Sequence, residues 1–360
     1  MSTANRDQSV VRSLAAQIPE AKLTTKYDGM GQLISLQIGQ LSAKSLPTQI
    51  WKFNNLKELD LRWNELRTLP REIASLSSLK WLGLSSTGLK ELPAELGHLR
   101  DLEWLDLRWN ALRRLPKEIG HLHLLTKLYL DDNELEELPA ELGRLEHLQK
   151  LDLGHNKLRK IPRELGQLRS LERLYLDDNE LEELPAELGR LSGLDLSVRK
   201  NHLKTVPPQL WRLNNLFSLH LSENELREVP VEVGQAHHLM YLEIRRNALR
   251  EVPAEVGQLS SLTWLDLSEN ELREVPATLG QLQHLVKLNL SGNRLRGVPV
   301  EIGQLSNLEI LDLRNNQLRE LPVELGQLSK LREFHVSGNA LSEIPDAIRH
   351  PQAFRSNDLL

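Results

Sequence analysis

Residues 102–125 read LEWLDLRWNALRRLPKEIGHLHLL, and variants of this stretch recur through almost the whole chain. Its leucines, its asparagine and its proline follow the pattern LxxLxLxxNxLxxLP. A fixed period of this length is the sequence signature of a solenoid, in which each repeat packs only against its neighbours. The prolines that mark the register lie 23 residues apart, with one step of 22 at Pro207: Pro47, Pro70, Pro93, Pro116, Pro139, Pro162, Pro185, Pro207, Pro230, Pro253, Pro276, Pro299, Pro322 and Pro345.

An asparagine stands six residues before most of these prolines. Its amide can bond the backbone of neighbouring coils and satisfy groups that a turn leaves unpaired. We therefore predict a buried structural ladder of asparagines, one for each coil. Its members are Asn64, Asn110, Asn133, Asn156, Asn179, Asn201, Asn224, Asn247, Asn270, Asn293, Asn316 and Asn339.

The alternation within one repeat predicts which side chains are inside. Leu105 and Leu107 flank Asp106 with the period of a short strand, so the two leucines face one side and the aspartate faces the other. Pro116 opens a return segment whose apolar residues suit the inner face of a short helix. The predicted fold class is an α/β solenoid with a parallel sheet on the concave face and short helical turns on the convex face.

The recurring consensus LPxELGxLxxLxxLxLxxNxL resembles that of leucine-rich repeat proteins. It is similar to the intracellular Ras-suppressor and plant Ras-group-related type, and to bacterial relatives. The resemblance covers about residues 33–345. It implies a horseshoe that binds other macromolecules, usually proteins, on its concave face.

The repeat divides the chain into three parts. Residues 1–32 are predicted to form an N-terminal cap of a short helix and a β-hairpin, and residues 33–345 a solenoid of fourteen repeats. Residues 346–360 are expected to be a C-terminal cap or tail. In the first repeat Leu41 replaces the asparagine. The 22-residue step predicts an irregular junction near Gly193, where we hypothesise that two seven-repeat arrays were joined.

Composition excludes several functional classes. The net charge of −5 over 360 residues provides no broad basic field for nucleic acid or an anionic membrane. No apolar run is long enough to span a bilayer. The chain has no cysteine, which excludes disulfides and thiolate zinc sites. Without a recognisable signal peptide, the expectation is a cytoplasmic protein, with a monomer favoured; delivery into a host cell stays open.

Aromatic and arginine residues gather at concave positions in the N-terminal half. Such side chains form binding hot spots because they bury large areas with few rotors to freeze. We expect this group to bind a partner, although the same rings can also stack as a ladder without any ligand. Its members are Arg62, Trp63, Trp81, Trp104, Arg108, Trp109, Tyr129 and Tyr175.

Charged bands follow along the same predicted face. An acidic band comprises Asp131, Asp132, Asp177 and Asp178, with His155 between them. A basic step comprises Arg199, Lys200, Arg245 and Arg246, interleaved with Glu223 and Glu269, so that ion pairs within the surface compete with binding to an acidic partner. Tyr241 and Trp264 complete the predicted partner-binding residues.

No nucleotide, zinc-protease or serine-hydrolase motif is present, and we expect no enzyme activity, no metal and no cofactor. The leading interpretation is a scaffold that docks a protein partner on its concave face, in intracellular signalling or host interaction. Two alternatives remain open at this point. One is a carbohydrate or small-ligand receptor that stacks its ligand on Trp81 and Trp104. The other is the sensor part of an enzyme whose catalytic domain lies elsewhere.

Overall fold

The computed structural model describes residues 3–40 and 46–348. Leu41 and residues 349–360, on which parts of the sequence interpretation rest, lie outside the described residues. The chain forms two compact units, unit 1 (Met1–Glu180) and unit 2 (Leu181–Leu360). No helix among the described residues has the length and apolar character needed to cross a bilayer.

In each unit the strands follow one another in sequence order. In unit 1, β1 is antiparallel to β2, and β2 to β8 are parallel. In unit 2, β9 to β15 are parallel. The strands of unit 1 are β1 Lys22–Tyr27, β2 Leu33–Gly39, β3 Glu58–Asp60, β4 Trp81–Gly83, β5 Trp104–Asp106, β6 Lys127–Tyr129, β7 Lys150–Asp152 and β8 Arg173–Tyr175. Those of unit 2 are β9 Leu194–Ser197, β10 Leu216–His220, β11 Tyr241–Glu243, β12 Trp264–Asp266, β13 Lys287–Asn289, β14 Ile310–Asp312 and β15 Glu333–His335.

The return segments contain 3-10 helices. Pro116, which opens the return segment, is the N-cap residue of its helix, and its carbonyl accepts a bond of 3.0 Å from the Ile119 N–H. This three-residue spacing defines a 3-10 turn. The helices are η1 Thr48–Lys52, η2 Arg71–Ser75, η3 Ala94–His98, η4 Lys117–His121, η5 Ala140–Arg144, η6 Arg163–Gln167, η7 Ala186–Arg190, η8 Pro208–Arg212, η9 Val231–Gln235, η10 Ala254–Gln258, η11 Ala277–Gln281, η12 Val300–Gln304, η13 Val323–Gln327 and η14 Asp346–Ile348.

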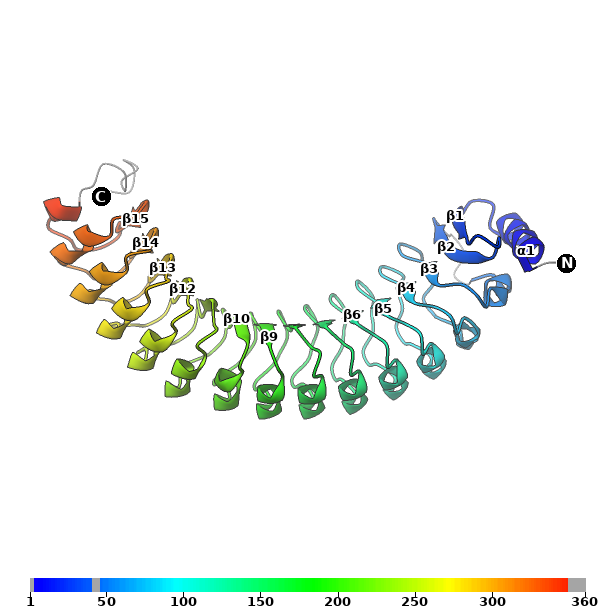
Figure 1. Ribbon diagram of the computed structural model, residues 1–360, viewed down its shortest axis with the longest axis horizontal. Coiled ribbons are helices and arrows are strands. Elements are labelled where there is room, and N and C mark those ends of the chain that lie inside the picture. The colour runs from blue at the N-terminus through cyan, green and yellow to red at the C-terminus, as the bar shows by residue number, and fades with distance from the viewer. Residues whose placement is uncertain (1–2, 41–45, 349–360) are drawn as a thin grey trace. The chain divides into compact units, whose positions relative to one another are not determined.

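The core lies between the strands and the 3-10 helices. Leu102, Leu105, Leu107 and Ile119 are all fully buried, as are their counterparts in most other coils. Within each unit the strands line the inner side and the 3-10 helices the outer side (Figure 1). The predicted α/β leucine-rich solenoid is therefore confirmed, because within each unit the strand leucines of successive coils stack into an apolar layer.

Glycine sets the distance between return segments. A Cβ built on Gly120 would overlap the carbonyl oxygen of Glu141 in the next coil, and one on Gly143 would overlap that of Glu164. The recurring glycine therefore lets adjacent coils approach closely, because only a residue without a side chain fits against this backbone.

Each asparagine of the ladder ties one coil to its neighbour. The Asn133 Nδ2 donates to the carbonyls of Leu107 at 2.9 Å and Leu130 at 3.0 Å. Its Oδ1 accepts the N–H of Leu112 at 3.1 Å. At the third repeat Thr87 takes the place of asparagine, and its hydroxyl donates to the Leu84 carbonyl at 2.6 Å. A single amide thus satisfies buried backbone groups on two coils.

A helix and a hairpin precede the regular coils. The helix α1, Thr3–Gln17, buries Leu14 and is followed by the β1–β2 hairpin. The carboxylate of Asp7, itself buried, accepts the Leu33 N–H at 2.9 Å and so links α1 to the first residue of β2. We propose that these elements cover the open edge of the sheet, as terminal repeats must.

The coil around residues 191–218 departs from the others. Leu191, which ends η7, has a ψ of 152°, whereas its counterpart Leu122 has a ψ of 61°. The pairing of β10 with β9 shifts register between Leu216 and Ser218. These departures fall where the chain has one residue fewer than a regular repeat.

Candidate functional site

Strand alternation places rows of polar and aromatic side chains on the inner sheet face. One row runs through the residue before each first strand leucine, so Trp81 lies in register with Trp104. A second row lies two residues on and pairs Asp106 with Tyr129. These side chains are partly exposed except for Asp106, while the leucines between them are buried. Side chains in neighbouring rows are close enough to interact.

The residue before each asparagine has a left-handed backbone. Trp63, Trp109, His155 and Arg246 all show a φ between 52° and 61°, as do their counterparts in most other coils. Such a conformation costs an L-residue energy and persists only where the surroundings enforce it. Here the Trp109 N–H donates to the Asp131 carbonyl of the next coil at 3.2 Å. The turn projects its side chain away from the core, so Trp63 is 68% exposed and Trp109 45%.

The exposed tryptophans form a pair across an intervening coil. The ring centroids of Trp63 and Trp109 are 5.6 Å apart, with the rings tilted by 34°. The coil between them carries the small Ser86 at the equivalent position, which leaves room for the two rings to meet. On the neighbouring strands β5 and β6, Trp104 and Tyr129 form a second pair with ring centroids 5.5 Å apart. We call Trp63, Trp81, Trp104, Trp109 and Tyr129 the aromatic cluster.

The arginines beside this cluster are already paired. Arg108 donates to both carboxylate oxygens of Asp106, at 2.9 and 2.8 Å, and Arg62 makes the same bidentate contact with Asp60. The Arg108 guanidinium also lies 5.3 Å from the Trp109 ring centroid and 5.1 Å from that of Tyr129. The hydrogen bond with Asp106 raises the pKa of Arg108 further above its ordinary value. These arginines therefore brace the rings in place.

The acidic band follows the aromatic cluster in unit 1. Burial raises the pKa of Asp131 to about 6, and the charge of Asp152 adds to this effect. Its Oδ1 is buried and has no hydrogen-bond partner among the described residues. The ionised carboxylate of Asp131 is thus poorly compensated at neutral pH, and a cation placed beside it would be stabilised.

Other members of the band have partners of their own. His155 Nδ1 lies 3.4 Å from a carboxylate oxygen of Asp178. Gly154 separates Asp131 from Asp177, and a Cβ built on Gly154 would meet their atoms only at ordinary contact distances. Asp132 is partly exposed beside Asp131. Within the described ranges, no group of three or more His, Asp or Glu side chains is arranged to hold a metal ion.

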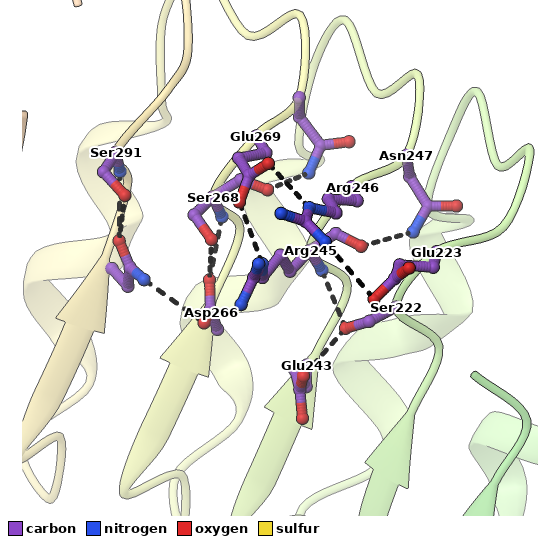
Figure 2. A network of polar contacts seen from close by, with 12 residues as sticks. Ser222, Glu223, Glu243, Arg245, Arg246, Asn247, Asp266, Ser268, Glu269 and Ser291 are labelled. Carbon is purple, nitrogen blue, oxygen red and sulfur yellow. Dashed lines mark hydrogen bonds and ion pairs between the residues drawn. The ribbon is translucent and has the colours of Figure 1, made fainter. Parts of the chain in front are cut away.

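The basic step of unit 2 is crossed by ion pairs, as Figure 2 shows. Arg245 and Arg246 both bond the carboxylate of Glu269, at 3.0 and 2.7 Å. Arg246 also lies 3.6 Å from a carboxylate oxygen of Glu223. These contacts support the interpretation as ion pairs within the surface, because the interleaved glutamates compensate much of the positive charge.

The remaining predicted residues also lie on the inner face. Tyr175 has Lys150 Nζ 4.9 Å from its ring centroid. Lys200 is exposed at a left-handed turn. Tyr241 and Trp264 pack edge to face with centroids 6.3 Å apart. The structure thus brings together the aromatic cluster in unit 1 and, in unit 2, Arg245 and Arg246 with the interleaved Glu223 and Glu269.

Sequence reasoning missed the acidic residues that hold the arginines. Asp60 and Asp106 stand two residues before Arg62 and Arg108 in the recurring LDLRW, and strand alternation puts i and i+2 on one face. It also missed a cluster in unit 2, in which Arg199, His220 and Glu243 are joined by hydrogen bonds. The members of this cluster are far apart in the sequence, and only the coil register makes them neighbours.

Comparisons with known proteins identify the family. A profile described as "Leucine-rich repeat region" matches residues 71–135, 230–295 and 279–355. Two others, described as "Leucine rich repeat", match residues 123–181 and 55–76. The chain belongs to the leucine-rich repeat family. A search of curated proteins returned no match.

Solved structures show the same fold. A leucine-rich repeat protein of Leptospira interrogans is 36% identical, with a TM-score of 0.76 over 89% of this chain and 88% of that one. PEPR1 in its complex with AtPEP1 is 28% identical, with a TM-score of 0.79, and the match covers 94% of this chain and 56% of that one. A chain of the Toll–Spätzle complex of Drosophila is 26% identical, with a TM-score of 0.77, and the match covers 87% of this chain and 45% of that one. The chain therefore spans about half the length of these two larger proteins.

Proposed function

We propose that this chain is a scaffold that binds a protein partner on the inner sheet face of unit 1. The observation that carries this proposal is the solvent-exposed Trp63–Trp109 pair, held in place by left-handed turns and by Arg108. A rigid exposed pair of large rings is the usual composition of an interface hot spot, because little entropy is lost when it is covered. The names of the Toll–Spätzle and PEPR1–AtPEP1 structures record complexes of related folds, which supports a protein partner.

The neighbouring charges indicate the chemistry of that partner. The acidic band begins one coil after Trp109, and the buried Oδ1 of Asp131 has no hydrogen-bond partner among the described residues. The middle of the tryptophan pair lies at the coil of Ser86, two coils before that of Asp131. Two coils span about 10 Å, which an extended segment covers in about three residues. The segment that fits best presents an apolar or aromatic side chain to the tryptophan pair and a basic side chain about three residues away.

The carbohydrate alternative has less support. A sugar that stacks on a tryptophan needs an open ring face, but Arg62 lies 5.1 Å from the centroid of Trp81 and Lys127 Nζ lies 4.5 Å from that of Trp104. These cations occupy the rings on which that alternative depends. Membership of the Ras-suppressor type, a signalling or host-interaction role and a cytoplasmic location remain proposals that follow from the sequence.

A selection experiment tests the proposal. Purified protein is exposed to a displayed library of random peptides, and affinities of recovered peptides are measured for the wild type and for Trp63→Ser/Trp109→Ser. We expect peptides with an apolar and a basic residue to be recovered. The double variant should lose at least about 30-fold in affinity, since a hot spot contributes about 2 kcal/mol or more.

The control for this experiment is Leu124→Ser, which alters an apolar side chain of similar exposure on the return segment after η4. It should bind as the wild type does. Circular dichroism verifies that each variant is folded. Peptides that bind the double variant equally well would refute the docking surface. Recovery of glycans but no peptides from parallel arrays would favour the carbohydrate receptor.

A further inference from the structure

Three side chains of unit 2 form a connected chain of hydrogen bonds on the inner sheet face. The Ser218 Oγ lies 2.7 Å from Nε2 of His220, and Nδ1 of His220 lies 2.9 Å from Oε2 of Glu243. Ser218 and His220 are two residues apart on β10 and so share a face, while β11 places Glu243 directly beside His220. A hydroxyl, an imidazole and a carboxylate in this order are the parts of an activated serine nucleophile.

The carboxylate is held firmly. Glu243 accepts a bond from the Ser222 hydroxyl at 2.9 Å, as Figure 2 shows, and another from Arg199 at 2.6 Å. The hydrogen bond with His220, together with the Arg199 charge and the other bonds, lowers the pKa of Glu243 to about 2. The carboxylate therefore stays ionised over the physiological pH range and can orient the imidazole.

The position of the imidazole proton decides the role of Ser218. Arg199 Nη2 lies 2.8 Å from Nδ1 of His220, a contact that would suit an unprotonated Nδ1. That tautomer would also direct a lone pair of Nδ1 at the ionised Glu243 oxygen 2.9 Å away. A proton on Nδ1 instead donates to Glu243 and leaves Nε2 as the acceptor for the Ser218 hydroxyl. We take this second tautomer as the reactive one.

The surroundings of Ser218 indicate the kind of substrate. On one side its register neighbour is Tyr241, followed by Trp264, and these rings are 42% and 39% exposed. On the other side its neighbour is the carboxylate of Asp195. An apolar group can lie on the exposed rings, whereas Asp195 disfavours an anion. An uncharged ester with an apolar acyl group fits this arrangement.

We propose that Ser218 is the nucleophile of an acyl-transfer site in unit 2, with His220 as its general base and Glu243 as a positioning residue. The Ser218 Oγ bonds to the ester carbonyl carbon while its proton passes to Nε2 of His220. The bond to the alkoxy group then breaks, and the alcohol leaves with that proton. Water, deprotonated by His220, attacks the acyl-serine in turn, which releases the acid and restores the hydroxyl.

The inference is tested with two probes on the full chain. Release of p-nitrophenol from p-nitrophenyl butyrate measures turnover, and a fluorophosphonate measures covalent capture. Trypsin should yield the peptide of residues 213–227, in which mass spectrometry is expected to place the adduct on Ser218 and not on Ser222. Ser218→Ala should abolish both signals. His220→Gln should slow labelling at least about 100-fold, as expected for loss of a general base.

The role of Glu243 is tested by the pH dependence of labelling, which would not change if Glu243 only stabilised the fold. Glu243→Gln should shift the pH dependence of labelling to lower pH, because a neutral amide no longer stabilises the imidazolium. The matched control is Ser268→Ala, since Ser268 is an inner-face serine bonded to Asp266 without a histidine, and it should leave labelling unchanged. Absence of an adduct on wild-type Ser218, or esterase activity that persists in folded Ser218→Ala, would overturn the proposal.

Discussion

Replacing Leu176 with alanine is expected to lower the free energy of unfolding by about 2–5 kcal/mol. Leu176 is fully buried in the layer of strand leucines, so its truncation removes apolar contacts and leaves a cavity. The adjacent coils are tied by the asparagine ladder and cannot close over that cavity. Denaturation by urea measures the loss, and tryptophan fluorescence reports mainly on unit 1, which holds five of the seven tryptophans.

The control for this change is Leu124→Ala, which removes the same atoms from a side chain that is 44% exposed. Its effect should stay within about 0.5 kcal/mol. Equal effects of the two substitutions would mean that the leucines of the strands do not face the interior.

Replacing Asn179 with alanine is expected to destabilise unit 1 by about 1–3 kcal/mol. The Asn179 Nδ2 donates to the carbonyls of Leu153 and Leu176 at 3.0 and 3.1 Å, and its Oδ1 accepts the Leu158 N–H at 3.0 Å. Alanine removes the acceptor of the Leu158 N–H and one donor to each of the two carbonyls, although Leu153 still accepts a bond from Asn156 at 3.0 Å. Asn179→Asp should destabilise as well, because one oxygen can still accept the Leu158 N–H but the other faces the carbonyls of Leu153 and Leu176 and cannot donate to them.

The exposed Asn54 provides a control, since Asn54→Ala removes an amide at the surface. Urea midpoints and hydrogen exchange at Leu158 report the two effects separately. A Leu158 amide that stays as protected in Asn179→Ala as in the wild type would contradict the role given to the ladder.

The repeat register made the fold predictable. Leucines, asparagines and prolines occur at fixed spacings because each contacts its own counterpart one coil away, as Leu82 pairs with Leu105. The repeat register did not decide the helical form of the return segment, because five residues after a proline suit either an α or a 3-10 turn. The Ile119 bond to the Pro116 carbonyl decides for the latter.

The candidate sites were harder to infer because they depend on distances between coils. The sequence placed Arg62 and Arg108 beside the tryptophans and suggested that both cations were available to a partner. In the structure each guanidinium is instead bound by the carboxylate of Asp60 or Asp106. The contact of Trp63 with Trp109 depends on the small Ser86 between them. These side-chain contacts follow from strand direction and coil spacing, and neither can be read from a single sequence motif.

The hydrogen-bonded Ser218, His220 and Glu243 of unit 2 were not evident for a related reason. Ser218 and His220 are close in sequence, but Glu243 stands a full repeat away. Serine-hydrolase motifs place the nucleophile on a sharp turn, whereas here all three side chains belong to the paired strands β10 and β11.

The docking surface exists only if the side chains of Trp63 and Trp109 point away from the core, and hydroxyl-radical footprinting with mass spectrometry measures this directly. We expect rapid oxidation of Trp63 and Trp109, which the left-handed turns expose, and strong protection of Trp211, which is fully buried. Intermediate rates are expected for Trp81 and Trp104, which are partly exposed. Oxidation of Trp211 as fast as that of Trp63, or protection of Trp63 and Trp109 in the isolated protein, would contradict the docking surface and the side-chain directions on which it rests.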